Sequence, residues 1–510
     1  MVAQLFRDRT NLACMIFFAV LVVLGVAVHR DYGLSWDEPF QAAYGHQVFA
    51  YVFQGDAGLF QGTNKYYGPA FELVLVGVEK MAGITDLQTV YFMRHLLTFL
   101  LFAAGVYFFY RLNVRIFASR ILGLLGALFL VLSPRIFAHA FYNPKDVPFL
   151  AVFVISIYTL VRYLDDKSIR NAVIHALACA LVVDIRVVGL VVPLITLGFA
   201  GFDALKRHDS DRRLRELAGL GVYLACLIPL VILFWPTLWH RPFHNIVEAF
   251  GQMSHYPYQG SVFYLGRYVP AAELPWHYTP VWILISTPVT YAVFFLVGIG
   301  FAAKTLVRSA KCAPKRRNLI LLLTWFLLPL GYVMFSDAVV YDAWRHTFFI
   351  YPALLAIALL GLRGLFRLVR ARLTNGTASA LRLAMIMFLS INLAGTAWFM
   401  IRNHPYQNLY FNMLVGGVRG AAPKFDLDYW GVSYRKALEF LVSHDSNRMI
   451  KVSAHSRPGE TNAALLPADQ RCRLVFLDDP LKAKYFVTDR RWERRQYRPQ
   501  DILYLSLIHI

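Results

Sequence analysis

Long apolar stretches recur along the chain and alternate with short segments that are rich in charged residues. An α-helix needs about 20 apolar residues to cross the hydrocarbon core of a bilayer. Windows of about 19 residues predict such crossings near 12–28, 95–110, 121–138, 148–163, 217–239, 280–303, 319–336, 347–362 and 381–401. The pattern therefore predicts a mainly α, polytopic membrane protein.

One apolar stretch, 171–202, has an unusual length and is interrupted by Asp184 and Arg186. As a single helix it would be about 48 Å long, which exceeds one crossing, yet it is too short for two full crossings. Basic residues flank both of its ends, and the positive-inside rule places such flanks on the cytoplasmic side. We therefore expect two short helices that turn at 184–186 on the outer face, which brings the total to about 11 crossings.

The basic residues also orient the whole chain. Arg7 and Arg9 precede the first apolar stretch, and no small-residue cleavage site follows before His29, which favours an uncleaved anchor. Further basic loops lie at 111–120, 304–317 and 363–372. With the N-terminus and these loops on the inner side, residues 402–510 are expected on the outer side.

These crossings divide the chain into a transmembrane domain, 1–402, and an outer domain, 403–504. The transmembrane domain has an outer loop at 29–94 and a second at 240–279, both rich in aromatic residues, Gly and Pro, and both expected to be ordered. In the outer domain the pattern predicts a helix over 434–442 and strands over 449–454, 473–477 and 484–488, hence a small α/β domain. Residues 505–510 resemble a translated sequencing adapter, and we expect a non-native tail there.

Composition agrees with a membrane protein and excludes several other classes. Hydrophobic residues make up 58% of the chain and charged residues 16%, whereas soluble domains have ~45–50% and ~25%. These values exclude a disordered or collagen-like chain, and the five cysteines lack the paired spacing of zinc sites or disulfide frameworks. The net charge is +20, but the basic residues are scattered between apolar stretches, so we expect no nucleic-acid partner.

Two adjacent carboxylates, Asp37 and Glu38, directly follow the first crossing. Carboxylates at a membrane surface are costly to bury without partners. A carboxylate here could act as a general base on an acceptor hydroxyl, or could hold a divalent cation. The alternative is structural, because Asp37 before Glu38 and Pro39 also resembles the N-cap of a helix.

Trp36, Asp37 and Glu38, followed by the sequence YGHQVFAY at 44–51, resemble the first outer loop of the GT-C glycosyltransferases. The resemblance is closest to the protein O-mannosyltransferases and aminoarabinose transferases, and it covers most of 10–435. Members of this family take a sugar from a polyprenyl-phosphate donor and pass it to an acceptor on the outer side of the membrane. The resemblance implies that Asp37 is catalytic with Glu38 as its neighbour. It also implies a bacterial inner-membrane protein with a cytoplasmic N-terminus and a periplasmic or extracellular C-terminal domain.

Two further segments of the outer side extend the resemblance. Lys65, in the sequence NKYYGP at 64–69, lies where related enzymes carry a lysine, and it could neutralise the donor phosphate. The alternative for Lys65 is an interfacial lysine that snorkels. Asp146, in FYNPKDVPF at 141–149, corresponds to a second acidic site of the family, near a metal or the acceptor. The alternative for Asp146 is an N-cap for the next crossing.

A last segment contains Arg345 and His346, and the family typically has an Arg-His pair at this place. The fork of an arginine suits the oxygens of a phosphate or pyrophosphate. Arg186 is a further candidate for the same cavity. Its alternative is an ion pair with Asp184, two residues away.

The chain departs from the family in two respects. It lacks the β-trefoil insert of the eukaryotic protein mannosyltransferases, so the acceptor stays open among a glycan, a lipid and a protein. It lacks the clear acidic-x-Asp metal motif of the oligosaccharyltransferases, so dependence on a divalent metal stays open, and the sequence itself calls for no cofactor. The sequence thus predicts an inverting hexosyl- or pentosyltransferase. The rival class is a transporter or a flippase for lipid-linked sugars, although transporters often show repeated halves and the second half of this chain does not mirror the first.

Overall fold

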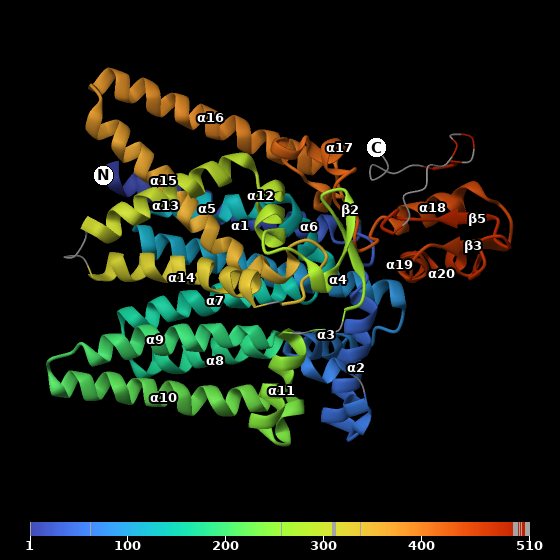
Figure 1. Cartoon of the computed structure of the whole chain (residues 1–510), viewed down its shortest axis with the longest axis horizontal. Coiled ribbons are helices and arrows are strands. Elements are labelled where there is room, and N and C mark those ends of the chain that lie inside the picture. Colours follow the sequence, from blue (N-terminus) through green and yellow to red (C-terminus); the bar gives the residue numbers. More distant parts are fainter. Residues whose placement is uncertain are drawn as a thin grey trace.

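The computed structural model (Figure 1) describes residues 2–61, 63–254, 256, 258–308, 313–336, 338–492, 498, 500 and 502–504. Within these residues nine helical segments are long and apolar enough to cross a membrane, or ten if the bent pair α5 and α6 is one crossing. The expected tail at 505–510 lies outside the described residues. The helices of the bundle are α1 (Val2–Val28), α4 (Leu87–Phe117), α5 (Arg120–Val131), α6 (Pro134–Tyr142), α7 (Asp146–Asp165), α8 (Ile169–Ile185), α9 (Val191–Leu205), α10 (Ser210–Phe234), α13 (Val289–Arg308), α14 (Ala313–Phe335), α15 (Tyr351–Arg372) and α16 (Asn375–Arg402).

The predicted fold class, a mainly helical polytopic protein, is confirmed, with nine or ten candidate crossings where about 11 were expected. The difference includes α8, whose 17 residues extend over about 26 Å, less than the ~30 Å of a bilayer's hydrocarbon core. The stretch 171–202 does form two helices, because α8 ends at Ile185 and a short 3₁₀ helix, η3 (Val187–Leu190), leads into α9.

Prolines interrupt the helix within two of the predicted crossings. The stretch 280–303 consists of α12 (Tyr278–Ser286) and α13, and Thr287 between them is extended (φ −93°, ψ 136°) because it precedes Pro288. The stretch 121–138 bends by 68° between α5 and α6, where Pro134 opens the second helix.

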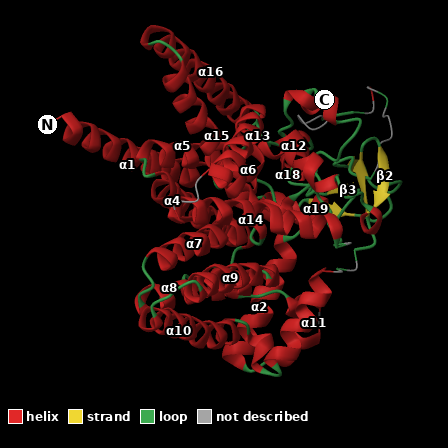
Figure 2. Ribbon diagram, turned by 60° about the vertical axis from the view of Figure 1, so that its left-hand side comes forward, coloured by secondary structure: helices red, strands yellow, loops and turns green. Residues whose placement is uncertain are grey.

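Helices α7 and α15 form the centre of the bundle. In the apolar stretch of α7, 89% of the residues are buried inside the protein, and in the stretch that contains α15 the buried share is 83%. The buried share is only 17% in the apolar stretches of α1 and α16. In Figures 1 and 2, α16 diverges from the other helices. Polar groups in the first turns of α7 and α15 are therefore shielded from lipid by neighbouring helices.

Both outer loops contain regular structure, and they gather at the end of the bundle that carries the C-terminal domain (Figure 1), here called the domain end. The first loop forms α2 (Glu38–Gln54), η1 (Ala57–Gln61), η2 (Thr63–Tyr66) and α3 (Ala70–Met81). The second forms η4 (Pro236–Trp239), α11 (Pro242–Ser254), an antiparallel hairpin of β1 (Ser261–Tyr264) and β2 (Arg267–Pro270), and η5 (Ala271–Glu273). Before α15, η6 (Arg345–Ile350) also lies at this end.

The C-terminal domain contains the predicted helix and the three predicted strands. Helix α18 (Tyr434–His444) precedes a parallel sheet of order β4-β3-β5, formed by Leu474–Phe476, Ile450–Ala454 and Tyr485–Val487. The connection from β3 to β4 consists of α19 (Pro458–Thr461), η9 (Asn462–Leu465) and α20 (Ala468–Arg471). The strands lie only at the domain end in Figure 2.

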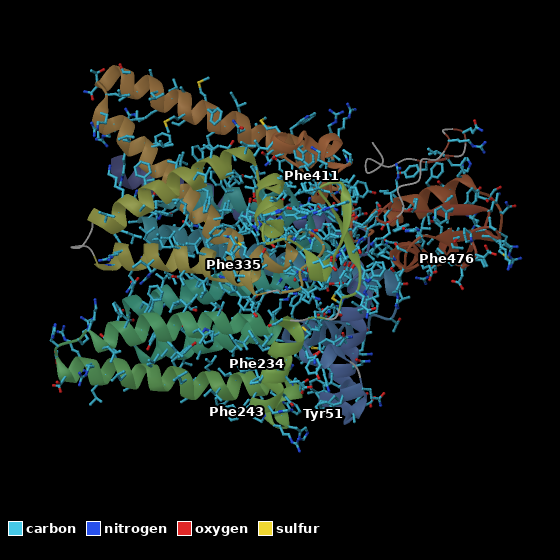
Figure 3. All side chains as sticks on the ribbon, viewed as in Figure 1. Tyr51, Phe234, Phe243, Phe335, Phe411 and Phe476 are labelled. Carbon is cyan, nitrogen blue, oxygen red and sulfur yellow. The ribbon has the colours of Figure 1, made fainter. Side chains whose placement is uncertain are left out.

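The segment between α16 and α18 packs against the bundle rather than against the C-terminal sheet. It contains η7 (Gln407–Leu409), η8 (Met413–Val415) and α17 (Gly417–Ala421). Phe411 of this segment is buried against Trp282 of α12, whereas Phe476 of β4 packs in a second hydrophobic cluster around α18 and β3 (Figure 3). The core of the C-terminal domain begins at Tyr434.

Candidate active site

Asp37 lies at the N-cap position of α2, but its side chain makes no capping hydrogen bond. Its Oδ2 atom instead lies 3.3 Å from Nζ of Lys145 and 3.3 Å from Nη1 of Arg345. Pro39 in the first turn starts the helix without help from a cap, because its φ is already helical. The side chain of Asp37 therefore serves the ion cluster rather than the helix.

Asp146 is the first residue of α7, and it too pairs with arginines rather than capping its helix. Its Oδ1 lies 2.6 Å from Nη1 of Arg186, and its Oδ2 lies 3.1 Å from Nη1 of Arg345. The cap is provided by Asn143, whose Oδ1 accepts the backbone N–H of Asp146 at 2.8 Å. Arg186 thus pairs with Asp146 and not with Asp184, whose carboxylate accepts the N–H of Ala70 at 2.5 Å.

Arg345 connects three carboxylates at the start of the span that contains α15. Besides Asp37 and Asp146, its Nη2 lies 3.3 Å from Oδ2 of Asp342. The rings of Tyr341 and Trp430 lie 5.0 and 4.9 Å from its guanidinium carbon, which gives cation–π contacts. Arg345 is 1% exposed, and an arginine so buried needs these partners to offset its desolvation.

Asp342 has a left-handed backbone, with φ of 58°, which costs free energy for a residue other than glycine. Its conformation is held by hydrogen bonds from distant segments. Nε1 of Trp430 donates to Oδ2 of Asp342 at 3.0 Å, and Arg491 of the C-terminal segment also pairs with its carboxylate. The N–H of the next residue, Ala343, donates to the hydroxyl of Tyr278 at 3.1 Å.

The positive charges around Asp37 determine its protonation. Burial acts to raise the pKa of Asp37, but the charges of Lys145 and Arg345 lower it by more, despite the nearby carboxylate of Asp146. The pKa of Asp37 is therefore below its ordinary value, and the group is ionised at neutral pH.

Glu38 faces away from this cluster. Its Oε1 lies 2.8 Å from Nε2 of His95 in α4, and its Oε2 accepts the N–H of Ser35 at 2.8 Å. Glu38 is 1% exposed. Glu38 is thus next to Asp37 in sequence, but its side chain lies on a different side of the turn and connects α2 to α4.

Lys65 is not brought to the cluster. It lines a separate cavity of about 270 Å³ together with His240, Asn245 and Glu248. Its Nζ lies 5.0 Å from the ring centre of Tyr66 and pairs with no carboxylate of the described residues. The structure places Lys145 beside Asp37 instead.

Lys145 is the residue that sequence reasoning missed. It is 8% exposed, and its Nζ also lies 4.5 Å from the ring centre of Tyr67. A signal was present, because a lysine next to Asp146, between two prolines and directly before an apolar crossing, has little reason to be there without a partner. Asp342 and Trp430 gave no comparable signal.

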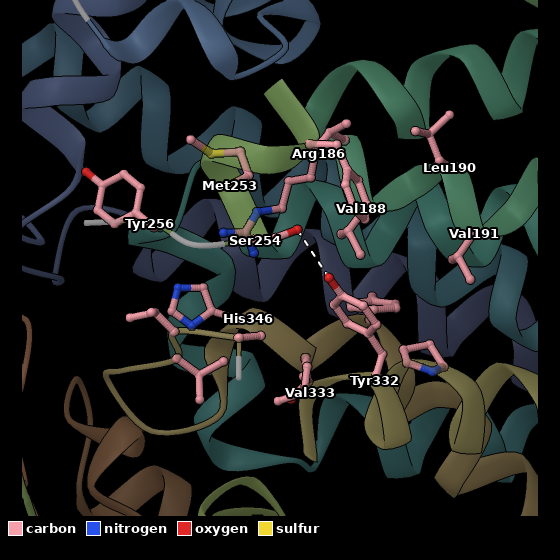
Figure 4. Close-up of a pocket in the computed structure, with 18 of the residues that line it drawn as sticks. Arg186, Val188, Leu190, Val191, Met253, Ser254, Tyr256, Tyr332, Val333 and His346 are labelled. Carbon is pink, nitrogen blue, oxygen red and sulfur yellow. Dashed lines mark hydrogen bonds between the residues drawn. The ribbon is translucent and has the colours of Figure 1, made fainter. Parts of the chain in front are cut away.

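A cavity of about 390 Å³ opens beside the ion cluster, between η3, α9, α11 and α14. Figure 4 shows Arg186 and His346 toward one part of this cavity and Leu190 and Val191 toward another. Most of the lining is apolar, and Arg186 connects it to the cluster through Asp146. The cavity therefore offers an apolar channel with a cationic end.

The donor set does not favour a metal ion at this place. Asp37, Asp146 and Asp342 are each paired with Lys or Arg side chains. Among the residues that the structure describes, no group of three or more His, Cys, Asp and Glu side chains could hold a metal.

Comparisons with known proteins match both the sequence and the fold. Residues 80–235 match the sequence family described as dolichyl-phosphate-mannose-protein mannosyltransferase. No curated protein sequence matches the chain. Among solved structures, ArnT from Cupriavidus metallidurans bound to undecaprenyl phosphate is similar, with a TM-score of 0.51, 14% identity, and coverage of 92% of this chain and 87% of that chain.

A second similar structure is the Archaeoglobus fulgidus oligosaccharyltransferase tethered to an acceptor peptide. Its TM-score is 0.48, its identity is 11%, and the alignment covers 92% of this chain and 64% of that chain. The likeness to the first structure confirms the predicted fold.

Proposed function

We propose that this chain, which has the GT-C fold, is a membrane glycosyltransferase that transfers a sugar from a polyprenyl-phosphate donor to an acceptor hydroxyl, with Asp37 as the base. One observation carries the proposal. The apolar cavity has its cationic end, Arg186, in direct contact with Asp146, and Arg345 joins Asp146 to Asp37. The match of residues 80–235 to a lipid-phosphate-sugar family and the undecaprenyl phosphate bound by ArnT support the same donor class.

The cavity fits the two ends of such a donor. An isoprenoid chain is apolar, and Val191 and Leu194 of α9 and Leu328 of α14 provide an apolar wall for it. The phosphate would lie toward Arg186, Lys145 and Arg345, with His346 beside it. An arginine fork matches phosphate oxygens, and Lys145 adds a compact charge.

In the proposed reaction Asp37 accepts the proton of the acceptor hydroxyl as the oxygen attacks the anomeric carbon of the sugar. The bond between that carbon and the phosphate oxygen breaks, and the electron pair leaves with the phosphate. A single displacement of this kind inverts the anomeric configuration. The new negative charge develops on the phosphate, where Arg186, Lys145 and Arg345 stabilise it.

Because Asp37 is held in ion pairs, donor binding also changes how basic its carboxylate is. Without a donor, Lys145 and Arg345 hold the carboxylate of Asp37 ionised and weakly basic. A bound phosphate competes for the same two cations. Asp37 then becomes a stronger base when the donor is in place, and proton transfer is coupled to donor binding.

The remaining roles follow from position. Glu38 holds the start of α2 through His95, and Lys65 lies in its own cavity, so the proposed phosphate site uses Lys145 in place of Lys65. The site is at the domain end of the bundle, and we place this end on the periplasmic or outer side of a bacterial inner membrane. A hexose or a pentose as the sugar, and a glycan, lipid or protein as the acceptor, are all compatible with the site.

The test uses the purified full-length protein and a panel of undecaprenyl-phosphate sugars, with loss of donor followed by mass spectrometry. The wild-type protein should consume one donor in the presence of envelope glycans or lipids without an added energy source, and Asp37→Asn should not. Asp56→Asn is the matched control, because Asp56 is an exposed carboxylate of the same outer loop that contacts the backbone of Gly58. Transport of a donor across vesicles without consumption would instead identify the rival flippase class.

A further inference from the structure

The segment that connects α1 to Asp37 has no helix or strand between Val28 and Glu38. Hydrogen bonds from outside therefore determine its conformation. Residues of the C-terminal part of the chain, about 400 positions further along, donate or accept most of these bonds. These hydrogen bonds link the loop that carries the proposed base to the opposite end of the chain.

Asn462 of η9 makes the central contact. Its Oδ1 accepts the N–H of Leu34 at 2.8 Å, and its Nδ2 donates to the carbonyl oxygen of the same residue at 3.0 Å. The same amide group also donates to the carbonyl oxygens of Pro458 at 2.8 Å and Gly431 at 3.3 Å. Asn462 is 0% exposed, so each of these bonds replaces water completely.

Residues on either side of Leu34 are also held by hydrogen bonds from the C-terminal part of the chain. Arg435 of α18 donates from Nη1 to the carbonyl oxygen of Tyr32 at 2.9 Å, and also contacts that of Arg30. The N–H of Trp36 donates to the carbonyl oxygen of Trp430 at 3.1 Å.

At Gly33 the backbone of the segment lies directly against the C-terminal residues. A Cβ atom at this position would overlap the carbonyl oxygen of Val432 and would crowd Oδ1 of Asn462. The segment and the C-terminal residues therefore fit together with no space for a side chain between them.

We propose that Asn462 and Arg435 are positioning residues of the transferase, which hold the backbone of 30–34 and thereby place Asp37 between Lys145 and Arg345. The proposal rests on the proposed role of Asp37 as the base. Two residues separate Leu34 from Asp37, and the contacts of 3.3 Å that Oδ2 of Asp37 makes with both Lys145 and Arg345 tolerate little displacement. The C-terminal domain is then a structural part of the active site and not an independent module.

The experiment compares the full-length wild-type protein with Asn462→Ala, Arg435→Ala and a control, Val452→Ala. Val452 is a buried residue of β3, so its truncation weakens the core of the same domain without removing a contact to 30–36. Hydrogen exchange of peptides that span 30–36 is measured in detergent. We expect exchange to rise about tenfold or more in the Asn462 and Arg435 variants, because buried backbone groups lose their partners, and to stay at the wild-type rate in the control.

The second measurement is transfer from the undecaprenyl-phosphate sugar that the wild-type protein consumes. In Asn462→Ala, kcat should fall about tenfold or more while KM for the donor changes less than about twofold. The acidic limb of the pH–rate profile should also move to higher pH, because Asp37 leaves its cations. Unchanged exchange in both variants, or an equal change in Val452→Ala, would overturn the proposal. If the wild-type protein consumes no donor, the proposed function fails, whereas the exchange data still decide whether Asn462 and Arg435 hold the segment.

Discussion

Nη1 of Arg345 lies 3.1 Å from Oδ2 of Asp146, and each of these residues begins one of the two most buried candidate spans of the described chain. The pair therefore fixes the relative position of the two central helices at the domain end. The same nitrogen also contacts Asp37 at 3.3 Å. Packing of the bundle and geometry of the proposed active site thus depend on one guanidinium group.

Replacement of Arg345 by Met should destabilise the protein by about 3–5 kcal/mol, because Asp146 and its neighbours lose a buried counter-charge. The thermal unfolding midpoint in detergent is the measurement. Arg345→Lys should lose less stability but most transfer activity, since a lysine cannot bridge two carboxylates with a planar fork. The double variant Arg345→Met with Asp146→Asn should regain part of the lost stability. A double variant less stable than Arg345→Met alone would contradict this account.

Replacement of Lys145 by Met should shift the acidic limb of the pH–rate profile to higher pH. Lys145 lowers the pKa of Asp37, so its removal raises that pKa, and protonation then inactivates the base at a higher pH. Lys145→Arg should keep the wild-type profile, because the positive charge beside Asp37 remains. Lys65→Met should also keep the wild-type profile, because Lys65 contacts none of the carboxylates of the cluster. An unshifted limb in Lys145→Met would rule out this electrostatic role.

Replacement of Val191 by Trp should weaken donor binding. Val191 lines the cavity of about 390 Å³, and an indole there would occupy space that the proposed isoprenoid chain needs. We expect retention of undecaprenyl phosphate, measured by native mass spectrometry, to fall roughly tenfold with unchanged stability. Leu205→Trp is the control, because Leu205 lies on the same helix, is 74% exposed and does not line the cavity. Equal retention in both variants would exclude this cavity as the donor site.

The C-terminal domain should lose stability as the pH rises from about 4 to 7. Burial, reinforced by the charge of Asp428, raises the pKa of Asp489 to about 7, above its ordinary value of 3.8. The folded state then binds more protons than the unfolded state within this window, so the stabilising contribution is complete below pH 3.8 and is lost through pH 7. The difference in unfolding midpoint between the wild-type protein and Asp489→Asn, measured against pH, isolates the effect. A difference that does not vary between pH 4 and pH 7 would show that Asp489 titrates normally.

Sequence patterns predicted features that depend on local composition. The apolar stretches predicted a polytopic helical fold, and the pattern at 434–488 predicted one helix and three strands of the C-terminal domain, which the structure contains. The patterns did not show the helix breaks at Pro288 and Pro134, because hydropathy averages over such a break. Of the helices in the two loops, the patterns gave only the start of α2 at Asp37 and Glu38, as the structural alternative.

By itself the sequence determined that this protein crosses a membrane many times and that carboxylates next to its crossings need partners, because both follow from the cost of moving charge and backbone into lipid. Which partners they take was decided only by the tertiary structure. Asp146 pairs with Arg186 and Arg345, Glu38 turns to His95, and Asn462 holds Leu34 from the other end of the chain. A short-range pattern contains no information on contacts across hundreds of residues, since these are fixed by how the helices and the C-terminal domain pack together.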